Sequence, residues 1–265
     1  MATEPHILVF DSGLGGLSVA RTIRAQAPAT RLSYAADTAG FPYGDWDEED
    51  LRTHLVALIG RLIERARPDV VVIACNTASV VALAALRAAY PAMPFVGTVP
   101  AIKPAAMATA SGTIGVLATP STVRREYTRA LIDTYASHRR VVLHGAEGLA
   151  RLAEEKLLTG RVDGAKIAAE IAPVFVEEDG GRTDTLVLGC THYPLIGKEI
   201  AAAAPWPVRL IDPSPAIARR ALTIAATTTP APDTPSSGLA LLTREPDARL
   251  RALLAREGFG EVGVV

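Results

Sequence analysis

The sequence has few cysteines, few aromatic residues and almost no net charge. Of its 265 residues two are cysteines, and aromatic residues make up 5%. With 27 Lys and Arg against 28 Asp and Glu, the composition argues against a nucleic-acid or anionic-membrane surface. Apolar runs are short and interrupted, so no membrane span is predicted. Met1–Pro5 carries no basic region or cleavage site before the first strand pattern, so a cytoplasmic protein with reduced thiols is expected.

What the sequence does contain is an alternation of short apolar runs and longer amphipathic stretches. The runs predict strands at 6–10, 32–36, 70–74, 95–97, 113–118, 140–143, 185–189 and 208–211. The amphipathic stretches predict helices at 47–66, 83–90, 124–135, 149–158, 165–176 and 215–226. Residues 227–238 are expected to form a loop, and the tail from Leu239 one more strand, a helix and a short end. This order predicts an α/β fold with parallel, doubly wound sheets.

An internal repeat divides the chain into two similar halves. The segment Asp69–Thr77 resembles Asp184–His192, and each has an Asp six residues before a Cys at the end of a buried strand. We therefore expect two pseudo-symmetric α/β domains, residues 1–98 with 209–265 and residues 99–208. A pseudo-twofold relation would place Cys75 opposite Cys190 across an interdomain cleft, where open α/β sheets bind ligands.

The two cysteines are the strongest candidates for chemistry. Each follows a strand and starts a turn into a helix, where backbone N–H groups and the helix dipole favour a thiolate. A single cysteine could equally be a small buried apolar residue, but matched repeat positions make that explanation weak for both. The expected compartment argues against a disulfide, and two Cys with one nearby His leave a structural zinc site short of ligands.

Two facing thiols suit the inversion of a stereocentre without a cofactor. One group removes a proton from one face of a carbon while the other donates a proton to the opposite face. Thiols suit this exchange because their pKa lies closer to neutrality than that of most side chains. Asp11, at the end of the first strand, and His192, two residues after Cys190, are candidates for setting the thiols' protonation. Their alternative roles are a helix N-cap for Asp11 and a structural hydrogen bond for His192.

Donors for anionic substrate groups are expected at the turns that follow the strands. Hydroxyl and amide side chains gather there, and helix N-termini bind anions through their N–H groups. The candidates are Ser12, Asn76, Thr77, Thr119, Thr122 and Thr191. The loop Pro42-Tyr43-Gly44 could close over a ligand with its backbone. Ordinary turn and cap chemistry is the alternative for each residue.

Four motifs together resemble the glutamate racemase family. They are Phe10-Asp11-Ser12-Gly13-Leu14-Gly15-Gly16, Pro42-Tyr43-Gly44, Ala74-Cys75-Asn76-Thr77-Ala78 and Gly189-Cys190-Thr191-His192-Tyr193-Pro194. The resemblance, which runs from about residue 6 to about residue 212, implies two flavodoxin-like domains with the active site between them. It implies cofactor-independent interconversion of L- and D-glutamate for peptidoglycan synthesis, with no metal, no nucleic-acid or membrane partner, and a homodimer.

The resemblance also assigns roles to single residues. It implies that Cys75 works on the D face of the substrate and Cys190 on the L face. Thr119 and Thr122 match a substrate-contacting Thr-x-x-Thr, although Ala118 stands where many members have Gly. Glu154 falls near a family glutamate that helps to poise the second half.

Other classes of protein fit parts of this pattern. Gly13-x-Gly15 after a strand, with Asp37 after the next, suggests a dinucleotide enzyme, but Ser18 replaces the third glycine. A two-lobed solute-binding protein would explain the repeat but not the paired cysteines. Aspartate and hydantoin racemases share the two-thiol logic, and only the fuller motif match separates them from the glutamate enzyme.

Overall fold

The computed structural model describes residues 4–178, 181–228 and 238–265, and the chain divides into two compact units. The first unit is Met1–Thr98 with Ser214–Val265, and the second is Val99–Pro213. The boundary expected from the sequence lay at residue 209. Because the strand at 209–211 pairs with the strand at 185–188, the structure assigns residues 209–213 to the second unit.

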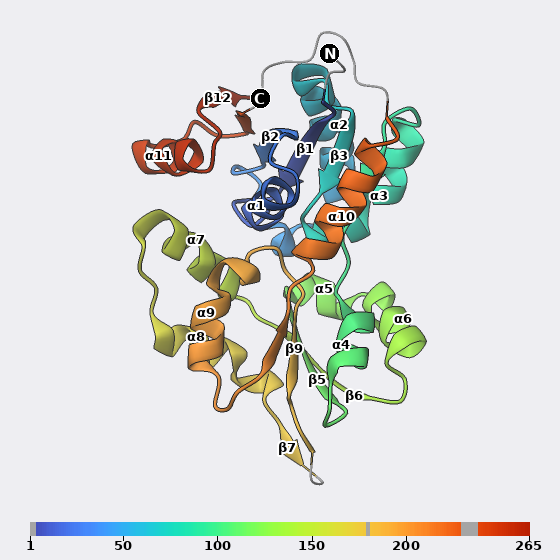
Figure 1. Cartoon of the computed structure of the whole chain (residues 1–265), viewed down its shortest axis with the longest axis vertical. Helices are drawn as coiled ribbons and strands as arrows, with labels where there is room; N and C mark the ends of the chain where they lie inside the picture. Colours follow the sequence, from blue (N-terminus) through green and yellow to red (C-terminus); the bar gives the residue numbers. More distant parts are fainter. Residues whose placement is uncertain (1–3, 179–180, 229–237) are drawn as a thin grey trace. The chain divides into compact units, whose positions relative to one another are not determined.

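The first unit is built on a six-stranded sheet in the order β12-β11-β2-β1-β3-β4, whose neighbours all run parallel. Its strands are β1 (His6–Asp11), β2 (Arg31–Ala36), β3 (Val70–Ile73), β4 (Phe95–Val96), β11 (Leu239–Leu242) and β12 (Glu261–Val264). Its helices are α1 (Leu17–Gln26), η1 (Tyr43–Asp45), α2 (Glu48–Ala66), α3 (Asn76–Ala89), α10 (Ser214–Ala225) and α11 (Ala248–Arg256). Figure 1 labels most of these elements along the chain.

The second unit has a four-stranded parallel sheet in the order β10-β9-β5-β6. Its strands are β5 (Thr113–Ala118), β6 (Arg140–Gly145), β9 (Thr185–Leu188) and β10 (Arg209–Ile211), and β7 (Glu177–Glu178) and β8 (Gly181–Arg182) pair separately as antiparallel strands. Its helices are α4 (Ile102–Ala108), α5 (Pro120–Arg124), α6 (Glu126–Tyr135), α7 (Leu149–Thr159), α8 (Gly164–Ile171), η2 (Ala172–Val174), η3 (Tyr193–Ile196) and α9 (Gly197–Ala203).

The two sheets share one strand order. Numbered from the first strand of each unit, β2-β1-β3-β4 and β6-β5-β9-β10 are both 2-1-3-4. The repeat predicted from the sequence is thus confirmed as a repeat of topology, and the predicted parallel α/β class is confirmed in both units. In this order the chain direction across the sheet reverses between the first and third strands, which is where α/β proteins of this kind bind ligands.

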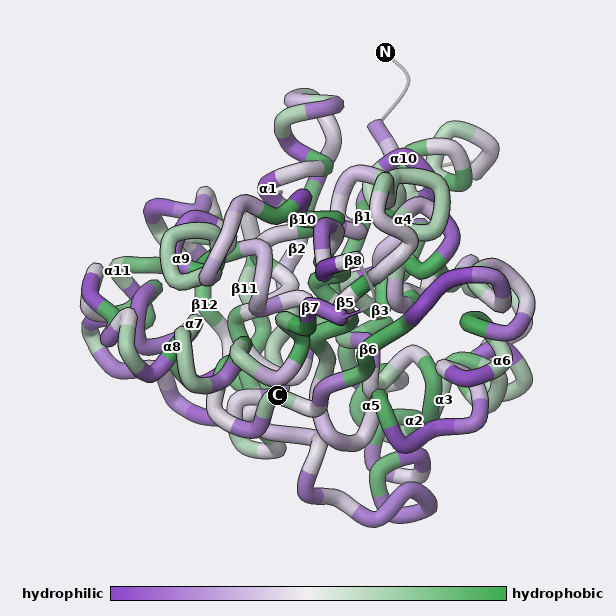
Figure 2. Tube along the Cα trace, turned by 90° about the horizontal axis from the view of Figure 1, so that it is seen from below, coloured by the Kyte–Doolittle hydropathy of each residue, from purple (hydrophilic) through white to green (hydrophobic). Residues whose placement is uncertain are grey.

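Burial on both faces explains why the strands are continuously apolar. In the first unit, Leu8, Phe10, Val71 and Ile73 are fully buried against the apolar side chains of α2 and α3. The alternate residues of β1 and β3 are equally buried on the face that α10 covers. In Figure 2 the tube is green along β3 and β5, whereas stretches of purple mark the outer helices and loops. A parallel sheet covered on both faces requires such runs.

Helix α2 shows how the sequence sets an element's limits. Asp47 is its N-cap and accepts hydrogen bonds from the backbone N–H groups of Glu49 and Asp50. Acidic residues in the first turn and Arg65 in the last match the helix dipole. The helix ends at Arg67, which takes the left-handed conformation (φ 46°) before Pro68. Leu51, Leu55, Leu58 and Leu62 form the buried stripe.

Several predicted elements differ from the structure. Helix α3 begins at Asn76, seven residues before the predicted start, and the predicted helix 124–135 is interrupted at Arg125, whose backbone is extended. Helix α8 ends at Ile171 and is followed by η2. Helices α1 and α4 and the β7–β8 pair were not predicted, and the short end of the tail is a strand, β12. The helix expected after Cys190 is a short η3 followed by α9. Most of the predicted loop 227–238 lies outside the described residues.

The repeated aspartates fix the start of the first strand in each unit. Asp69 accepts a hydrogen bond from the backbone N–H of His6 at 2.7 Å, at the start of β1. Asp184 accepts from the Thr109 hydroxyl and from the N–H groups of Ala110 and Ser111, just before β5. Both residues therefore tie the strand that leads to a cysteine to the strand beside it.

Replacing Asp184 with Asn should weaken the second unit in a pH-dependent way. Partial burial would raise the pKa of Asp184, but hydrogen bonds from Thr109 and Ser111 outweigh it and hold that pKa below its ordinary value. The ionised carboxylate therefore stabilises the fold above the ordinary pKa, and this contribution is lost as pH falls through the lowered pKa. Because the group is only partly buried, Asp184→Asn should lower the free energy of unfolding at neutral pH by only about 0.5–1 kcal/mol.

Urea unfolding at neutral pH and at about pH 3 measures this effect, and the difference from the unsubstituted chain should shrink at the lower pH. Asp133→Asn, on the exposed surface of α6, is the matched control and should change little at either pH. An equal loss at both pH values would contradict the assigned role of the carboxylate.

Candidate active site

The half-site of the first unit forms where β1 and β3 end side by side. Phe10 is paired with Ile73, and the N–H of Ala74 donates to the carbonyl of Phe10 at 2.8 Å, so Asp11 and Cys75 follow neighbouring strand ends. Gly16 lets the chain that leads into α1 come close to both strand ends, since a Cβ there would lie 2.8 Å from that of Asp11 and 3.4 Å from that of Ala74. The need for this close approach explains why the last residue of the Gly-rich motif, Gly16, is a glycine.

Asp11 is completely buried at this edge. Its carboxylate accepts a hydrogen bond from the backbone N–H of Gly13 at 3.0 Å. It is not the N-cap of the following helix, because α1 begins at Leu17 with Gly16 before it. The neighbouring Ser12 is also buried. The carboxylate thus closes a turn immediately after β1 rather than capping a helix.

Cys75 takes the N-cap position of α3, with its side chain 7% exposed. Asn76 and Thr77, the first two residues of the helix, are each 3% exposed. Neither the Nδ2 nor the Oδ1 atom of Asn76 has a hydrogen-bond partner. A buried amide with both atoms unsatisfied is rare in folded proteins and points to a ligand that supplies the missing partners.

The loop before α2 brings Tyr43 close to this edge. The Tyr43 hydroxyl donates to Asp37 Oδ2 at 2.7 Å, and the ring packs in the same apolar cluster as Cys75. Burial raises the pKa of Tyr43 well above its ordinary value, and the negative charges of Asp37, Cys75 and Asp11 raise it further. The phenol therefore stays neutral as a donor. Pro42 and Gly44, the other predicted loop residues, are only partly buried.

The half-site of the second unit is a chain of thiol, imidazole and carboxylate. Cys190 Sγ lies 3.6 Å from His192 Nδ1, and His192 Nε2 lies 3.0 Å from Glu154 Oε1. Because an ionised carboxylate only accepts hydrogen bonds, Nε2 carries the proton in the neutral ring and Nδ1 is left as the acceptor facing the thiol. The imidazole can thus take the proton of Cys190, and Glu154 stabilises the imidazolium that results.

Hydroxyl groups and a phenol follow the ends of β5 and β9, next to which the second thiol lies. Thr119 is the N-cap of α5, and its hydroxyl lies 3.0 Å from that of Thr122, which is fully buried. Thr191, next to the thiol, is 2% exposed. Burial raises the pKa of Tyr193 well above its ordinary value, and the nearby charges of Cys190 and Glu170 raise it further, so this phenol is also neutral.

The two half-sites place their thiols alike but support them differently. The first strand ends in Asp11 in one unit and in Ala118 in the other, so the carboxylate of the first half-site has no counterpart in the second. In the second half-site the ionisable partners are His192, two residues after the thiol, and Glu154 of α7. Two thiols with different partners can hold different protonation states at one pH.

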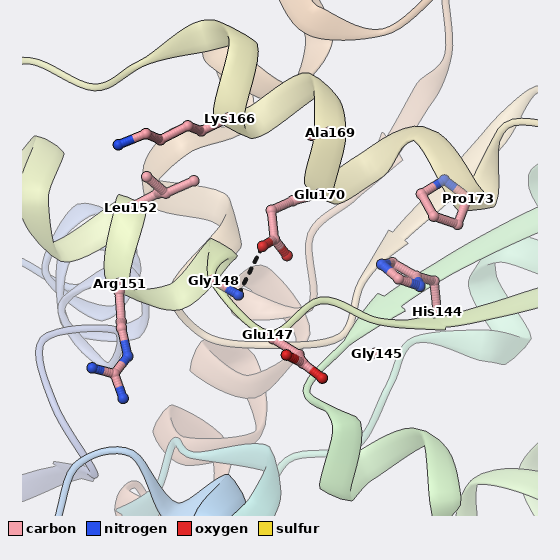
Figure 3. A pocket seen from close by; sticks show the side chains of 10 residues that line it. All are labelled: His144, Gly145, Glu147, Gly148, Arg151, Leu152, Lys166, Ala169, Glu170 and Pro173. Carbon is pink, nitrogen blue, oxygen red and sulfur yellow. Dashed lines mark hydrogen bonds between the residues drawn. The ribbon is translucent and has the colours of Figure 1, made fainter.

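A cavity elsewhere in the second unit contains no thiol. It has a volume of about 580 Å³ and is lined by His144, Gly145, Glu147, Gly148, Arg151, Leu152, Lys166, Ala169, Glu170 and Pro173. Figure 3 shows the hydrogen bond from the N–H of Gly148 to Glu170, which closes the N-terminus of α7 at 3.0 Å. None of the sequence-predicted site residues lines this cavity. Among the described residues, no three His, Cys, Asp or Glu side chains are grouped to hold a metal ion.

Sequence reasoning named candidate residues in both units but missed some of the groups that contact them. Glu154 was indicated by resemblance alone, since its helical pattern gives no hint of a histidine partner. Asp37, considered only as a ribose-binding acid, is engaged with Tyr43, His54 and Thr243. His54 has no motif around it in the sequence. Only contacts between distant segments identify these groups.

Comparisons with known proteins show the family of the chain. The model of the Asp/Glu/hydantoin racemase family matches residues 7–221, and the chain belongs to that family. The glutamate racemase of Brucella canis is 50% identical over 262 residues, which cover 98% of this chain and 94% of the relative. That of Brucella anthropi is 51% identical over 259 residues, covering 97% and 92%.

Solved structures give the same result. The glutamate racemase of Escherichia coli, determined in complex with L-glutamate and the activator UDP-MurNAc-Ala, is 38% identical with a TM-score of 0.92, covering 99% of this chain and 98% of that one. The glutamate racemase of Aquifex pyrophilus is 30% identical with a TM-score of 0.71, and 98% of each chain is covered. Within its family the chain therefore groups with the glutamate racemases, and it is an isomerase. None of the described helices is both long and apolar enough to cross a membrane.

Removing the Glu154 carboxylate should slow racemisation more than it weakens substrate binding. Glu154→Ala leaves His192 Nε2 without its acceptor, so the ring no longer holds Nδ1 towards the thiol. We expect kcat of Glu154→Ala to fall about 10- to 100-fold with KM changed less. Glu154→Gln keeps an acceptor oxygen, so its kcat should lie between those of Glu154→Ala and the unsubstituted chain. Glu155→Ala, on the exposed side of α7, is the matched control. An effect confined to KM would assign Glu154 to substrate binding instead.

Proposed function

We propose that this isomerase interconverts L- and D-glutamate by a two-thiol acid/base mechanism that needs no cofactor. The observation that carries the proposal is the occurrence of one thiol at the same topological position in each of two repeated sheets, after β3 and after β9. Inversion of an α-carbon requires a base on one face and an acid on the other, and two such thiols supply both. The similarity to glutamate racemases along nearly the whole chain supports glutamate as the substrate.

In this mechanism the two thiols act at one α-carbon from opposite faces, with Cys190 facing L-glutamate and Cys75 facing D-glutamate. From the L enantiomer, the Cys190 thiolate removes the α-proton while the Cys75 thiol donates its own proton to the other face. Reversal exchanges the two protonation states. His192, held by Glu154, takes the proton of Cys190 before this step, and the Asp11 carboxylate serves the same purpose beside Cys75.

Substrate binding is assigned to the polar groups around each thiol. The unsatisfied amide of Asn76 supports this role most directly, because a substrate carboxylate or ammonium would supply its missing partners. The remaining binding residues of the proposal are Ser12, Pro42, Tyr43, Gly44, Thr77, Thr119, Thr122 and Thr191. Asp11 has the wrong charge for a carboxylate but can meet the substrate ammonium.

The biological setting belongs to the proposal as well. D-glutamate made by this reaction would serve peptidoglycan synthesis in the cytoplasm, and the enzyme would act as a homodimer without a nucleic-acid or membrane partner. The balanced charge of the chain is consistent with the absence of an anionic partner.

Circular dichroism of substrate solutions tests the function directly. The purified chain, dialysed against a chelator and given no cofactor, should bring the optical signal of D-glutamate and of L-glutamate to zero. D-aspartate should lose its signal at least about 100-fold more slowly, because a side chain shorter by one methylene no longer reaches the same donors. Faster loss of the aspartate signal would reassign the substrate, and activity restored only by a metal or by pyridoxal phosphate would overturn the cofactor-free mechanism.

A further inference from the structure

A buried carboxylate, Asp37, links the C-terminal segment of the first unit to the loop that carries Tyr43. Its side chain is 1% exposed, and four groups contact it. Oδ2 accepts from the Tyr43 hydroxyl at 2.7 Å and lies 2.7 Å from His54 Nε2. Oδ1 accepts from the Thr243 hydroxyl at 2.7 Å and from the backbone N–H of Gly40 at 3.1 Å. Because both oxygens accept hydrogen bonds within the unit, the Asp37 carboxylate holds these segments together and is not available to bind a ribose.

The Asp37 carboxylate is ionised at neutral pH. Burial alone would raise the pKa of Asp37, but hydrogen bonds from Thr243, Tyr43 and His54 outweigh it and hold that pKa below its ordinary value. Hydrogen bonds to an ionised carboxylate are stronger than neutral ones. Each of the three side chains is therefore held more firmly than an ordinary surface contact would hold it.

Thr243 connects two segments that are about two hundred residues apart in sequence. It follows β11, the strand that pairs with β2 on the side away from β1. Its hydroxyl donates to Asp37 and accepts from the backbone N–H of Ala39 at 2.9 Å. A second bond alongside it runs from the N–H of Arg244 to the Thr38 hydroxyl at 3.2 Å. The C-terminal segment thus fixes the start of the Tyr43 loop at several points.

The other end of this chain of contacts reaches the first thiol. Tyr43 packs in the apolar cluster that contains Cys75. Trp46, one turn further on, holds the loop through its indole N–H, which donates to the carbonyl of Gly40 at 2.9 Å. Its ring packs against that of His54 at a tilt of 35°, with ring centroids 4.9 Å apart. Movement at Thr243 would therefore pass through Asp37 to Tyr43 and the environment of Cys75.

We propose that Thr243 is a positioning residue of the active site, whose hydroxyl acts through Asp37 to hold the loop Pro42–Gly44 against the Cys75 half-site. This inference rests on the proposed function, because it takes that loop as part of the substrate site. The C-terminal segment then helps to position the active-site loop, although it lies outside residues 7–221, which the family model matches.

Steady-state kinetics of Thr243 variants test the proposal. Thr243→Val keeps the shape of the side chain without the hydroxyl, and it should raise KM for both enantiomers about 10-fold while kcat falls less than about 3-fold. Thr243→Ser keeps the hydroxyl and should stay within about 2-fold of the unsubstituted chain. Thr223→Val is the matched control, since that hydroxyl only meets the carbonyl of Arg219 on the exposed side of α10.

A double-mutant cycle separates positioning from general loosening of the fold. If Thr243 acts through Asp37 on Tyr43, then Thr243→Val should change KM less than about 2-fold further in a chain that already carries Tyr43→Phe. Independent, multiplying effects of the two substitutions would overturn the proposal. So would a Thr243→Val variant with unchanged KM, or a Thr243→Ser variant as impaired as Thr243→Val. Thr243→Ala provides a second hydroxyl-free variant if the valine variant does not fold.

Alkylation of Cys75 tests the inference without glutamate turnover. In a Cys190→Ala chain Cys75 is the remaining thiol, because the sequence has two cysteines. Adding Thr243→Val should speed its reaction with iodoacetamide about 3- to 10-fold, because the Tyr43 loop no longer covers it. Thr223→Val should leave the rate unchanged. An unchanged rate with Thr243→Val would overturn the inference, whereas failure of the unsubstituted chain to racemise glutamate would overturn only the proposed function.

Discussion

The parallel pairing of the first and third strands in each sheet is the constraint on which both half-sites depend. Two strands that run side by side in the same direction end at the same edge, so the residues after them meet without any long excursion of the chain. β1 and β3 bring Asp11 and Cys75 to one edge in this way, and β5 and β9 bring Thr119 and Cys190 to the other. Asp69 and Asp184 secure the opposite ends of the same strand pairs.

The repeat places one thiol at an equivalent position in each unit, and differences between the two units give the two thiols different partners. One thiol has a buried carboxylate beside it on the next strand, whereas the other has an imidazole two residues away with a glutamate behind it. Inversion needs opposite protonation states for the two thiols, and reversal of the reaction exchanges those states. In the proposed mechanism, Asp11 in one unit and the His192–Glu154 pair in the other give each thiol its own partner for holding or releasing a proton.

Sequence reasoning predicted the strands well because burial on both faces leaves a strong, local signal. It missed α1 because the glycines before Leu17 favour a turn, and it started α3 too late because polar and β-branched residues follow Cys75. The candidate residues next to the cysteines stood out by their position after strands. The roles of Asp37 and Thr243 could not be predicted, since their contact joins segments far apart in sequence and the one pattern that includes Asp37 suggested a different role.

The central claim is that each thiol serves one face of the substrate, and exchange of the α-proton in D₂O measures this for each thiol separately. Cys75→Ser retains only the thiol of Cys190, so it should replace the α-proton of L-glutamate with deuterium while leaving D-glutamate unlabelled. Cys190→Ser should show the reverse preference, and neither variant should complete inversion at an appreciable rate. Equal exchange of both enantiomers by both variants would contradict the assignment of one thiol to each face.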